Sequence, residues 1–335
     1  MVSANITRLL ATYIDALHIL HYHEVLDGYG HLSVRNPYNP HTFFMMRQIA
    51  PALVSGPEDI GEYRIMDAEP VNPGAPGAPS ERYIHSEVLK RYPGINVALH
   101  GHPEELIAYS ISNVPLRPVI HMAPFLGKEV PVFNITEHYL PNDTRDFLVR
   151  DQRLGSALAA LFDSPTPCGI GSSVQSHHGD QDAADHGSAS RRGTTLGSSR
   201  HLSDDHGDDY GVCCNDRNDV GNDHSGYSND GADYPTHNIV LMQSHGFTAV
   251  ATDIRIATYE GIYAVVNARV QAEALKIQHA YHANQPHDGN DWVVYLNERQ
   301  IRDSWETEIN ILEKPWEMWV REVKVNPLYV NELDS

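Results

Sequence analysis

A long polar stretch over residues 165–235 limits what this chain can fold into. The stretch is rich in Asp, Gly, Ser and His, contains neither Glu nor Lys, and shows no apolar periodicity. Such a segment cannot bury enough apolar surface to offset the conformational entropy lost on ordering. We therefore expect a disordered insertion, with the fold built from the sequence on either side of it.

Cysteine content and charge narrow the class of protein. Three cysteines, an odd number and all within the polar stretch, imply no disulfide framework, so we expect a reducing, cytoplasmic location. The formal net charge of −20 argues against a nucleic-acid partner, because phosphate binding needs clustered Lys and Arg. The sequence has no apolar run of about 18 residues, so we also expect no membrane partner.

The flanking sequence alternates between helical and strand patterns, which indicates a layered α/β fold. Ser80 and Asp253 are the expected N-caps of two of the helices. The predicted helices cover residues 5–25, 80–92 and 253–283, and the predicted strands cover residues 30–35, 95–102, 238–243 and 247–251. On the last helix, the residues expected to face the core are Ile256, Ile262, Val266 and Val270.

Two histidines at the end of a predicted strand form the first candidate site. His100 and His102 are two residues apart, so both side chains leave the same face of the strand, about 6–7 Å apart along the backbone. Gly101 between them allows close approach from the other face. Neutral imidazoles at this spacing can bind one divalent ion, although an isolated His-x-His is a weak signal and ordinary core histidines are the alternative.

Two more residues extend this candidate site. His245 directly follows an apolar strand, where its side chain can project from the sheet into a cleft. Three histidines with open coordination positions are typical of a catalytic metal site. Glu81 lies at the start of a helix, where it either exchanges protons with a metal-bound substrate or simply interacts with the helix dipole.

Four motifs, taken together, resemble the class II aldolase/adducin family over about residues 6–164 and 237–283. The step of 19 residues from Glu81 to His100 belongs to the same pattern. The motifs are Gly30-His31-Leu32-Ser33, Pro79-Ser80-Glu81-Arg82-Tyr83-Ile84-His85, the segment from Arg91-Tyr92-Pro93-Gly94 to His100-Gly101-His102, and Ser244-His245-Gly246.

The resemblance implies a fold, an assembly and a set of site residues. The implied fold is an α/β three-layer αβα sandwich around a largely antiparallel central sheet. The implied assembly is a homo-oligomer, a tetramer with active sites at subunit interfaces. His100, His102 and His245 correspond to the metal ligands of the family, and Glu81 corresponds to its acid/base residue.

Departures from the family pattern disfavour a sugar-phosphate aldolase. His31 stands where such aldolases have Asn, and Pro79 replaces the first of two serines that hold phosphate. Met122 stands at the matching position of the tyrosine that protonates the leaving aldehyde, and a thioether cannot donate a proton.

A subgroup that decarboxylates hydroxylated aromatic acids is more similar, in the strings around His31, Glu81 and His121 and in the C-terminal segment 314–319. The resemblance implies a lyase in which a divalent cation, acting as a Lewis acid, stabilises the carbanion left by loss of carbon dioxide. Zinc is the expected metal, and Mn, Fe and Co also accept imidazole. The expected partner is a small organic acid.

Six residues are predicted to bind this substrate. The guanidinium groups of Arg35 and Arg82 match a carboxylate, and His31 can hydrogen-bond the same group. Arg47 is a further candidate for the carboxylate, in addition to these six. His121 can line the cleft. Ser33 and Ser80, from the matching motifs, complete the set. The alternative for each is a structural role.

The same residues are also compatible with other functions. The same metal site can serve aldol cleavage, epimerisation or dehydration of a small hydroxy-carbonyl compound, or an iron-dependent oxygenase, and a non-catalytic adducin-like scaffold is the remaining alternative. The predicted organisation is a family domain in two parts, 1–164 and 236–285, interrupted by the insertion at 165–235 and followed by a Trp-containing extension at 286–335.

Overall fold

A central sheet of seven strands organises the chain, as seen in a computed structural model that describes residues 4–74, 77–164, 233–283 and 293–333. Nearly all of the predicted insertion at 165–235 lies outside the described residues. The strands are β1 (His31–Arg35), β2 (Thr42–Met46), β3 (Ile60–Arg64), β4 (Val97–Gly101), β5 (Val132–Phe133), β6 (Ile239–Met242) and β7 (Gly246–Ala251). Their order in the sheet is β3-β2-β1-β4-β7-β6-β5, and only β5 and β6 pair in parallel.

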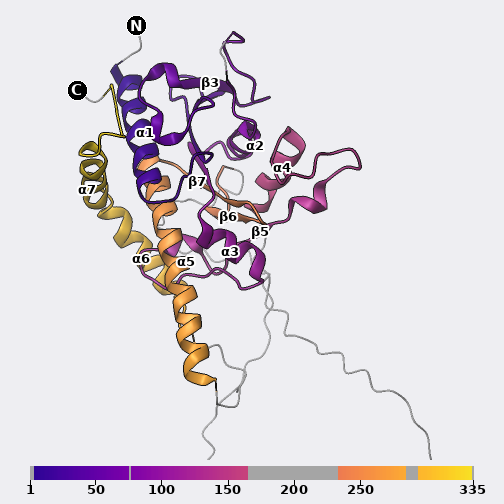
Figure 1. Ribbon diagram of the computed structural model, residues 1–335, viewed down its shortest axis with the longest axis vertical. Coiled ribbons are helices and arrows are strands. Elements are labelled where there is room, and N and C mark those ends of the chain that lie inside the picture. Colours follow the sequence, from indigo (N-terminus) through magenta and orange to yellow (C-terminus); the bar gives the residue numbers. More distant parts are fainter. Residues whose placement is uncertain (1–3, 75–76, 165–232, 284–292, 334–335) are drawn as a thin grey trace, which may run out of the picture. The chain divides into compact units, whose positions relative to one another are not determined.

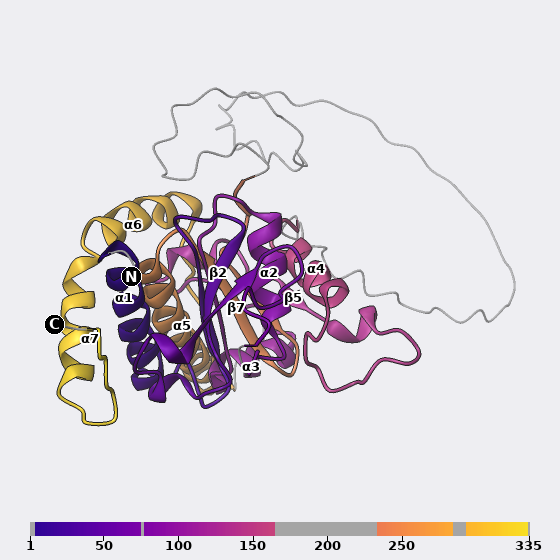
Figure 2. The ribbon, with the colours of Figure 1, turned by 90° about the horizontal axis from the view of Figure 1, so that it is seen from above.

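Helices cover both faces of this sheet (Figures 1 and 2). Helices α1 and α5 lie on one face, and α2 and α4 lie on the other. This arrangement confirms the predicted three-layer α/β/α fold with a largely antiparallel sheet. The helices are α1 (Ala4–Tyr22), α2 (Arg82–Arg91), α3 (Glu104–Ser112), α4 (Gln152–Leu161), α5 (Ile254–His282), α6 (Glu298–Asn310) and α7 (Glu313–Lys324).

Burial of strand β4 explains its continuous apolar sequence. β4 pairs with β1 on one side and β7 on the other, and all of its residues are buried. Tyr13 of α1 ties one helical layer to the sheet, because its hydroxyl donates to the Leu32 carbonyl (2.7 Å) and accepts from the Met46 amide (2.8 Å). Strand β4, which carries His100, therefore lies in the core between two paired neighbours.

The starts of two helices test the predicted caps. The Asp253 side chain accepts from the Arg255 amide and caps α5, as predicted. Helix α2 begins at Arg82, one residue later than a Ser80 cap requires, so the prediction for Ser80 was wrong. The N-cap position belongs to Glu81, whose side chain makes no cap hydrogen bond and is directed elsewhere.

Burial along α5 is only partly as predicted. Ile262 is buried, but Val266 is half-buried and Val270 is 41% exposed. Ile277 and Tyr281, further along, are also exposed. The C-terminal half of α5 extends past the sheet (Figure 1), so helical periodicity continues there without a core to face.

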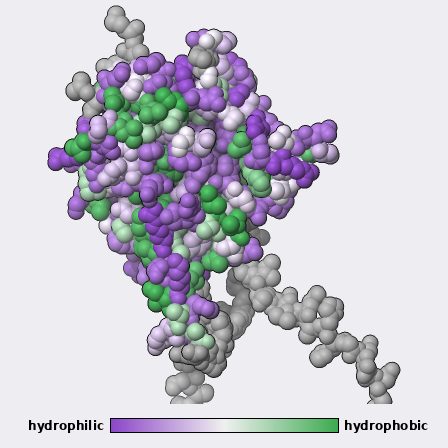
Figure 3. Space-filling view, viewed as in Figure 1, coloured by the Kyte–Doolittle hydropathy of each residue, from purple (hydrophilic) through white to green (hydrophobic). Residues whose placement is uncertain are grey.

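Of the two C-terminal helices, α7 packs against α1 and α6 packs against the segment around Phe125. Trp316 and Trp319 on α7 are buried against the core, and Trp305 on α6 is partly buried beside Phe125. On the face shown in Figure 3, apolar side chains form separate patches among polar ones. Of the helices described, none has a stretch apolar and long enough to cross a bilayer.

A buried carboxyl group on α5 gives stability a pH dependence. Burial raises the pKa of Glu260 to about 8, and the Asn238 amide, which donates to Oε1 (2.7 Å), offsets this in part. The folded state therefore keeps a proton that the unfolded chain loses near pH 4.5, so stability falls as the pH rises toward 8. We expect Glu260→Gln to raise the free energy of unfolding at pH 8 by a few kcal/mol, at about 1.4 kcal/mol per pKa unit, and to change it little at pH 4.

Urea unfolding of both proteins at pH 4, 6 and 8 measures this effect. An exposed α5 substitution, Glu273→Gln, is the matched control and should show no such trend. A stability difference between Glu260→Gln and the parent that does not vary with pH would show that Glu260 is ionised in the folded protein.

Candidate metal centre

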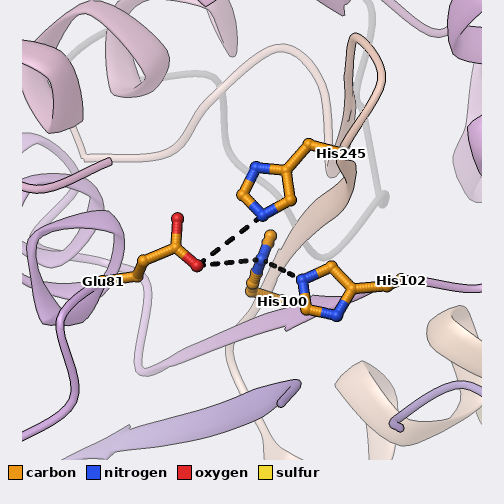
Figure 4. A group of neighbouring side chains, drawn as sticks. All are labelled: Glu81, His100, His102 and His245. Atoms are coloured by element: carbon orange, nitrogen blue, oxygen red, sulfur yellow. Dashed lines mark hydrogen bonds and ion pairs between the residues drawn. The ribbon is translucent and has the colours of Figure 1, made fainter. Parts of the chain in front are cut away.

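Four side chains from separate parts of the chain meet at one end of β4. His100 lies on β4, His102 follows that strand, His245 lies in the β6–β7 turn, and Glu81 lies at the N-terminus of α2. One donor atom from each residue lies within 4.8 Å of all the others. Figure 4 shows the three rings and the carboxylate directed toward one another. The four residues predicted as metal ligands and acid/base residue are thus brought together.

Close backbone contact places His245 over the end of β4. Gly101 pairs with Phe247, and a Cβ atom on Gly246 would lie 2.1 Å from the Gly101 carbonyl oxygen. Gly101 is equally restricted, because its own Cβ would lie 2.4 Å from the Val25 carbonyl oxygen. Gly246 therefore lets β7 approach β4, and Gly101 lets the segment after α1 approach β4.

Hydrogen bonds fix which nitrogen of each strand histidine faces the centre. His100 Nδ1 lies 2.9 Å from the Phe247 carbonyl, and His102 Nδ1 lies 3.1 Å from Asp27 Oδ1. Both partners are acceptors, so both Nδ1 atoms carry the ring proton and both Nε2 atoms have a free lone pair. These two Nε2 atoms lie only 2.9 Å apart. Two facing lone pairs repel each other unless a cation lies between them.

The Glu81 carboxylate has two different environments. Oε1 accepts from the Val149 amide (2.9 Å), which holds the side chain in place. Oε2 lies 3.7 Å from His100 Nε2 and 3.6 Å from His245 Nε2. Burial raises the pKa of Glu81 to about 7, against the lowering effect of the Val149 amide. One oxygen is thus anchored and the other faces the cluster.

The donor set fits a divalent cation. Burial lowers the pKa of His245 to about 4 and that of His100 well below its ordinary value, so both imidazoles are neutral, as metal ligation requires. Metal–nitrogen bonds of about 2.0–2.1 Å allow donors at the observed separations to share one ion. Three imidazoles with one carboxylate suit zinc and its neighbours rather than calcium or magnesium.

Asp27 is a site residue that the sequence analysis missed. Its carboxylate accepts from His102 Nδ1 and from the amides of Tyr29 and Gly30 (2.9 and 2.8 Å). Partial burial raises its pKa, but these hydrogen bonds outweigh that effect and hold the pKa far below the ordinary value. The signal available in the sequence was the Asp-x-x-Gly turn before the first strand, but nothing there points to a residue 75 positions away.

Loss of the Asp27 carboxylate should weaken metal binding. In Asp27→Asn the amide oxygen can still accept from His102 Nδ1–H, but it carries no negative charge to raise the basicity of the imidazole, so we expect a 10- to 100-fold lower affinity for zinc, roughly the effect of altering such a partner in known metal sites. Competition with a chromophoric chelator measures the affinity. The control is Asp67→Asn, which removes an exposed carboxylate paired with Arg64. An unchanged affinity in Asp27→Asn would contradict the assigned role.

A cavity of about 690 Å³ opens onto the cluster. Glu81, His102, His245, His31 and Ser80 all line it, so the structure brings two of the predicted substrate-binding residues to the centre. The cavity has a mixed polar and apolar lining, as small-molecule sites do. Its apolar wall is formed by Met46, Ile49, Pro79, Phe147 and Leu148.

Arg35 does not reach this cavity. Its guanidinium donates to backbone carbonyls, so it connects β1 to the chain that joins α2 to β4. With these acceptors it has a structural role in place of the predicted contact with a substrate carboxylate. The acceptors are the carbonyls of Pro40 (2.8 Å), Leu89 (2.7 Å), Tyr92 (3.3 Å) and Ile95 (2.8 Å).

Two other predicted substrate ligands also lie elsewhere in the described chain. Arg82 donates to the Ala68 carbonyl (2.8 Å) and to Glu69 (3.2 Å), because it points back along the loop before α2. The His121 side chain is 69% exposed and lies 3.6 Å from Glu308, in a separate surface hollow. Neither residue is among those that line the cavity at the cluster.

Ser33 is also displaced from its predicted role. Its side chain is fully buried, and its hydroxyl lies 2.7 Å from His85 Nδ1. Arg47, by contrast, lines the cavity, with its Nε donating to the Glu58 carbonyl (2.7 Å).

The fold and the cluster define a layered α/β protein with a candidate metal centre of the open, catalytic type. The family model for the Class II Aldolase and Adducin N-terminal domain matches residues 11–168. The chain is 35% identical to "Decarboxylase tropJ" of Talaromyces stipitatus over 321 residues, 96% of each chain. This chain belongs to the class II aldolase and adducin family, and it is an enzyme of the lyase type.

Further comparisons agree with this assignment. A "3,4-dihydroxyphthalate decarboxylase" of Arthrobacter keyseri is 27% identical over 166 residues, which are 45% of this chain and 61% of that protein. An aldolase II superfamily protein from Pseudomonas syringae superposes with a TM-score of 0.57 at 14% identity, over 98% of this chain and 96% of the other. An L-fuculose 1-phosphate aldolase from Glaciozyma antarctica superposes with a TM-score of 0.56 at 14% identity, over 99% and 95%. These two structures support the fold alone.

Proposed function

We propose that this protein is a metal-dependent decarboxylase of a hydroxylated aromatic acid or a related oxo acid. The observation that carries the proposal is the three-histidine cluster with Glu81 at the wall of a partly apolar cavity. Two similar proteins named as decarboxylases, one alike over 96% of this chain, support the same reaction class. That likeness to a named enzyme also weighs against the non-catalytic scaffold.

The residues of the cluster divide into a binding set and a proton-transfer group. His100, His102 and His245 would hold the cation through their Nε2 atoms, and a cation held there supplies Lewis-acid stabilisation of developing negative charge. Cleavage of the bond between the substrate carbon and its carboxylate releases carbon dioxide and leaves the electron pair on that carbon. Glu81 Oε2 then provides the proton that forms the new C–H bond, while the Val149 amide keeps the side chain oriented.

We also propose which cation is bound, which side chains contact the substrate, and how the chains assemble. Zinc is the proposed cation, because three neutral imidazoles with an open fourth position suit a catalytic zinc ion. His31 and Ser80 are the proposed polar contacts of the substrate. The protein is proposed to be cytoplasmic and homotetrameric. Light scattering of the purified protein tests the tetramer directly.

A direct assay tests the function. The full-length protein is purified, its metals are quantified, and carbon dioxide release is measured over a panel of hydroxybenzoic, hydroxyphthalic and oxo acids. We expect release with at least one hydroxylated aromatic acid, loss of release after chelation, and recovery when zinc is restored. An aldehyde product without carbon dioxide would indicate aldol cleavage instead, and consumption of oxygen would indicate an oxygenase.

A further inference from the structure

A buried row of polar side chains runs from the cavity wall into the core. His31 Nδ1 lies 2.7 Å from His85 Nε2, and His85 Nδ1 lies 2.7 Å from the Ser33 hydroxyl. All three residues are buried, and the metal-binding cluster uses none of them. Burying two imidazoles and a hydroxyl costs free energy that an apolar core would not. This row therefore needs an explanation beyond packing.

The surroundings of His85 determine the direction of its hydrogen bonds. Burial lowers the pKa of His85 to about 3, although a hydrogen bond with the Ala98 carbonyl raises this pKa in part. The ring is therefore neutral and carries one proton. Ala98 is the register partner of Ser33 across β1 and β4, and Nδ1 is the ring nitrogen that faces Ser33. Because a carbonyl can only accept, we infer that the ring proton is on Nδ1. His85 Nε2 then has a lone pair and accepts from His31 Nδ1–H.

The hydrogen bond to His85 leaves one ring nitrogen of His31 available on the cavity side. With its proton on Nδ1 and that atom bound to His85, the His31 ring has only Nε2 left to meet a ligand. His31 lines the cavity, and its ring centroid lies 4.9 Å from that of the ligand candidate His100. Its free nitrogen is therefore a hydrogen-bond acceptor beside the metal centre.

We propose that His85 is a positioning residue that fixes the tautomer of His31, so that His31 Nε2 accepts a hydrogen bond from a hydroxyl group of the substrate. The choice of a hydroxyl-bearing substrate rests on the proposed function. The tautomer itself does not, because it follows from hydrogen bonds within the protein. His85 does not line the cavity and would act only through His31.

Nitrogen NMR of the zinc-loaded, full-length protein labelled with ¹⁵N-histidine tests the tautomer directly. His31 is assigned by the signal that disappears in His31→Gln. We expect a protonated Nδ1 and a lone pair on Nε2. In His85→Phe, which keeps an aromatic ring beside Phe43, we expect the opposite tautomer, because a proton left on the buried Nδ1 would lose its acceptor. A proton on Nε2 in the parent protein, or no change in His85→Phe, would overturn the proposal.

The parent spectrum decides the tautomer even if His85→Phe does not fold. Kinetic measurements then test whether His31 accepts a hydrogen bond from a hydroxyl group of the substrate. We expect His31→Gln, whose amide oxygen can still accept, to lower kcat/KM about 10-fold, and His31→Leu to lower it about 100-fold, with zinc content unchanged in both. Equal losses in the two variants would overturn the hydroxyl contact. Failure to find carbon dioxide release with the parent protein would instead contradict the proposed function and leave the NMR result to stand by itself.

Discussion

We expect replacement of His100 with alanine to abolish both the proposed zinc binding and the proposed release of carbon dioxide. His100 Nε2 lies close to two of the other donor atoms, 2.9 Å from His102 Nε2 and 3.7 Å from Glu81 Oε2. Its ring is completely buried, so no other side chain can enter the same position. We expect kcat/KM to fall at least about 10³-fold, because the Lewis-acid contribution of a cation amounts to several kcal/mol.

Metal analysis and the carbon dioxide assay on the same preparation measure both effects. His279→Ala, which removes an exposed histidine near the end of α5, is the matched control and should keep metal and activity. Because His100 lies in the central strand, thermal unfolding of the variant is measured as well. A folded variant that keeps stoichiometric zinc would show that the histidine cluster is not the metal site.

Glu81→Gln should separate metal binding from catalysis. The variant keeps an oxygen that can accept from the Val149 amide but cannot provide a carboxylic proton. We expect zinc to remain bound by the three histidines, while kcat falls by about 10²–10⁴-fold, the usual contribution of a general acid or base.

Zinc content and activity of Glu81→Gln, compared with each other, identify the role of Glu81. If zinc is lost together with activity, Glu81 is a metal ligand and the proton comes from another group. If both zinc and activity are retained, Glu81 has no part in the reaction. Glu273→Gln, an exposed substitution on α5, controls for the change of charge.

Much of the site could be predicted because local geometry determines it. Residues two apart on a strand share a face, so His100 and His102 were paired correctly by their spacing alone. Glu81 was placed correctly at the start of α2 for a similar reason, although the exact N-cap was one residue off. The layered fold followed from the alternation of helical and strand patterns.

The tertiary structure decided what depends on segments far apart in the chain. Arg35 and Arg82 looked suited to a carboxylate, but whether a guanidinium is free depends on which carbonyls the fold brings to it, and both are occupied. Asp27 and Val149 entered the site only because folding brings their loops against His102 and Glu81.

Helix and strand periodicity, which acts over a few residues, was enough to indicate the layered fold, and short motifs indicated the residues of the centre. Which polar groups are free for a ligand, and which are bound within the protein, depends on contacts between segments far apart in the chain. His85 shows the reason. It lies four residues after Glu81 in the sequence, but the fold places its ring against Ser33 and His31 of β1.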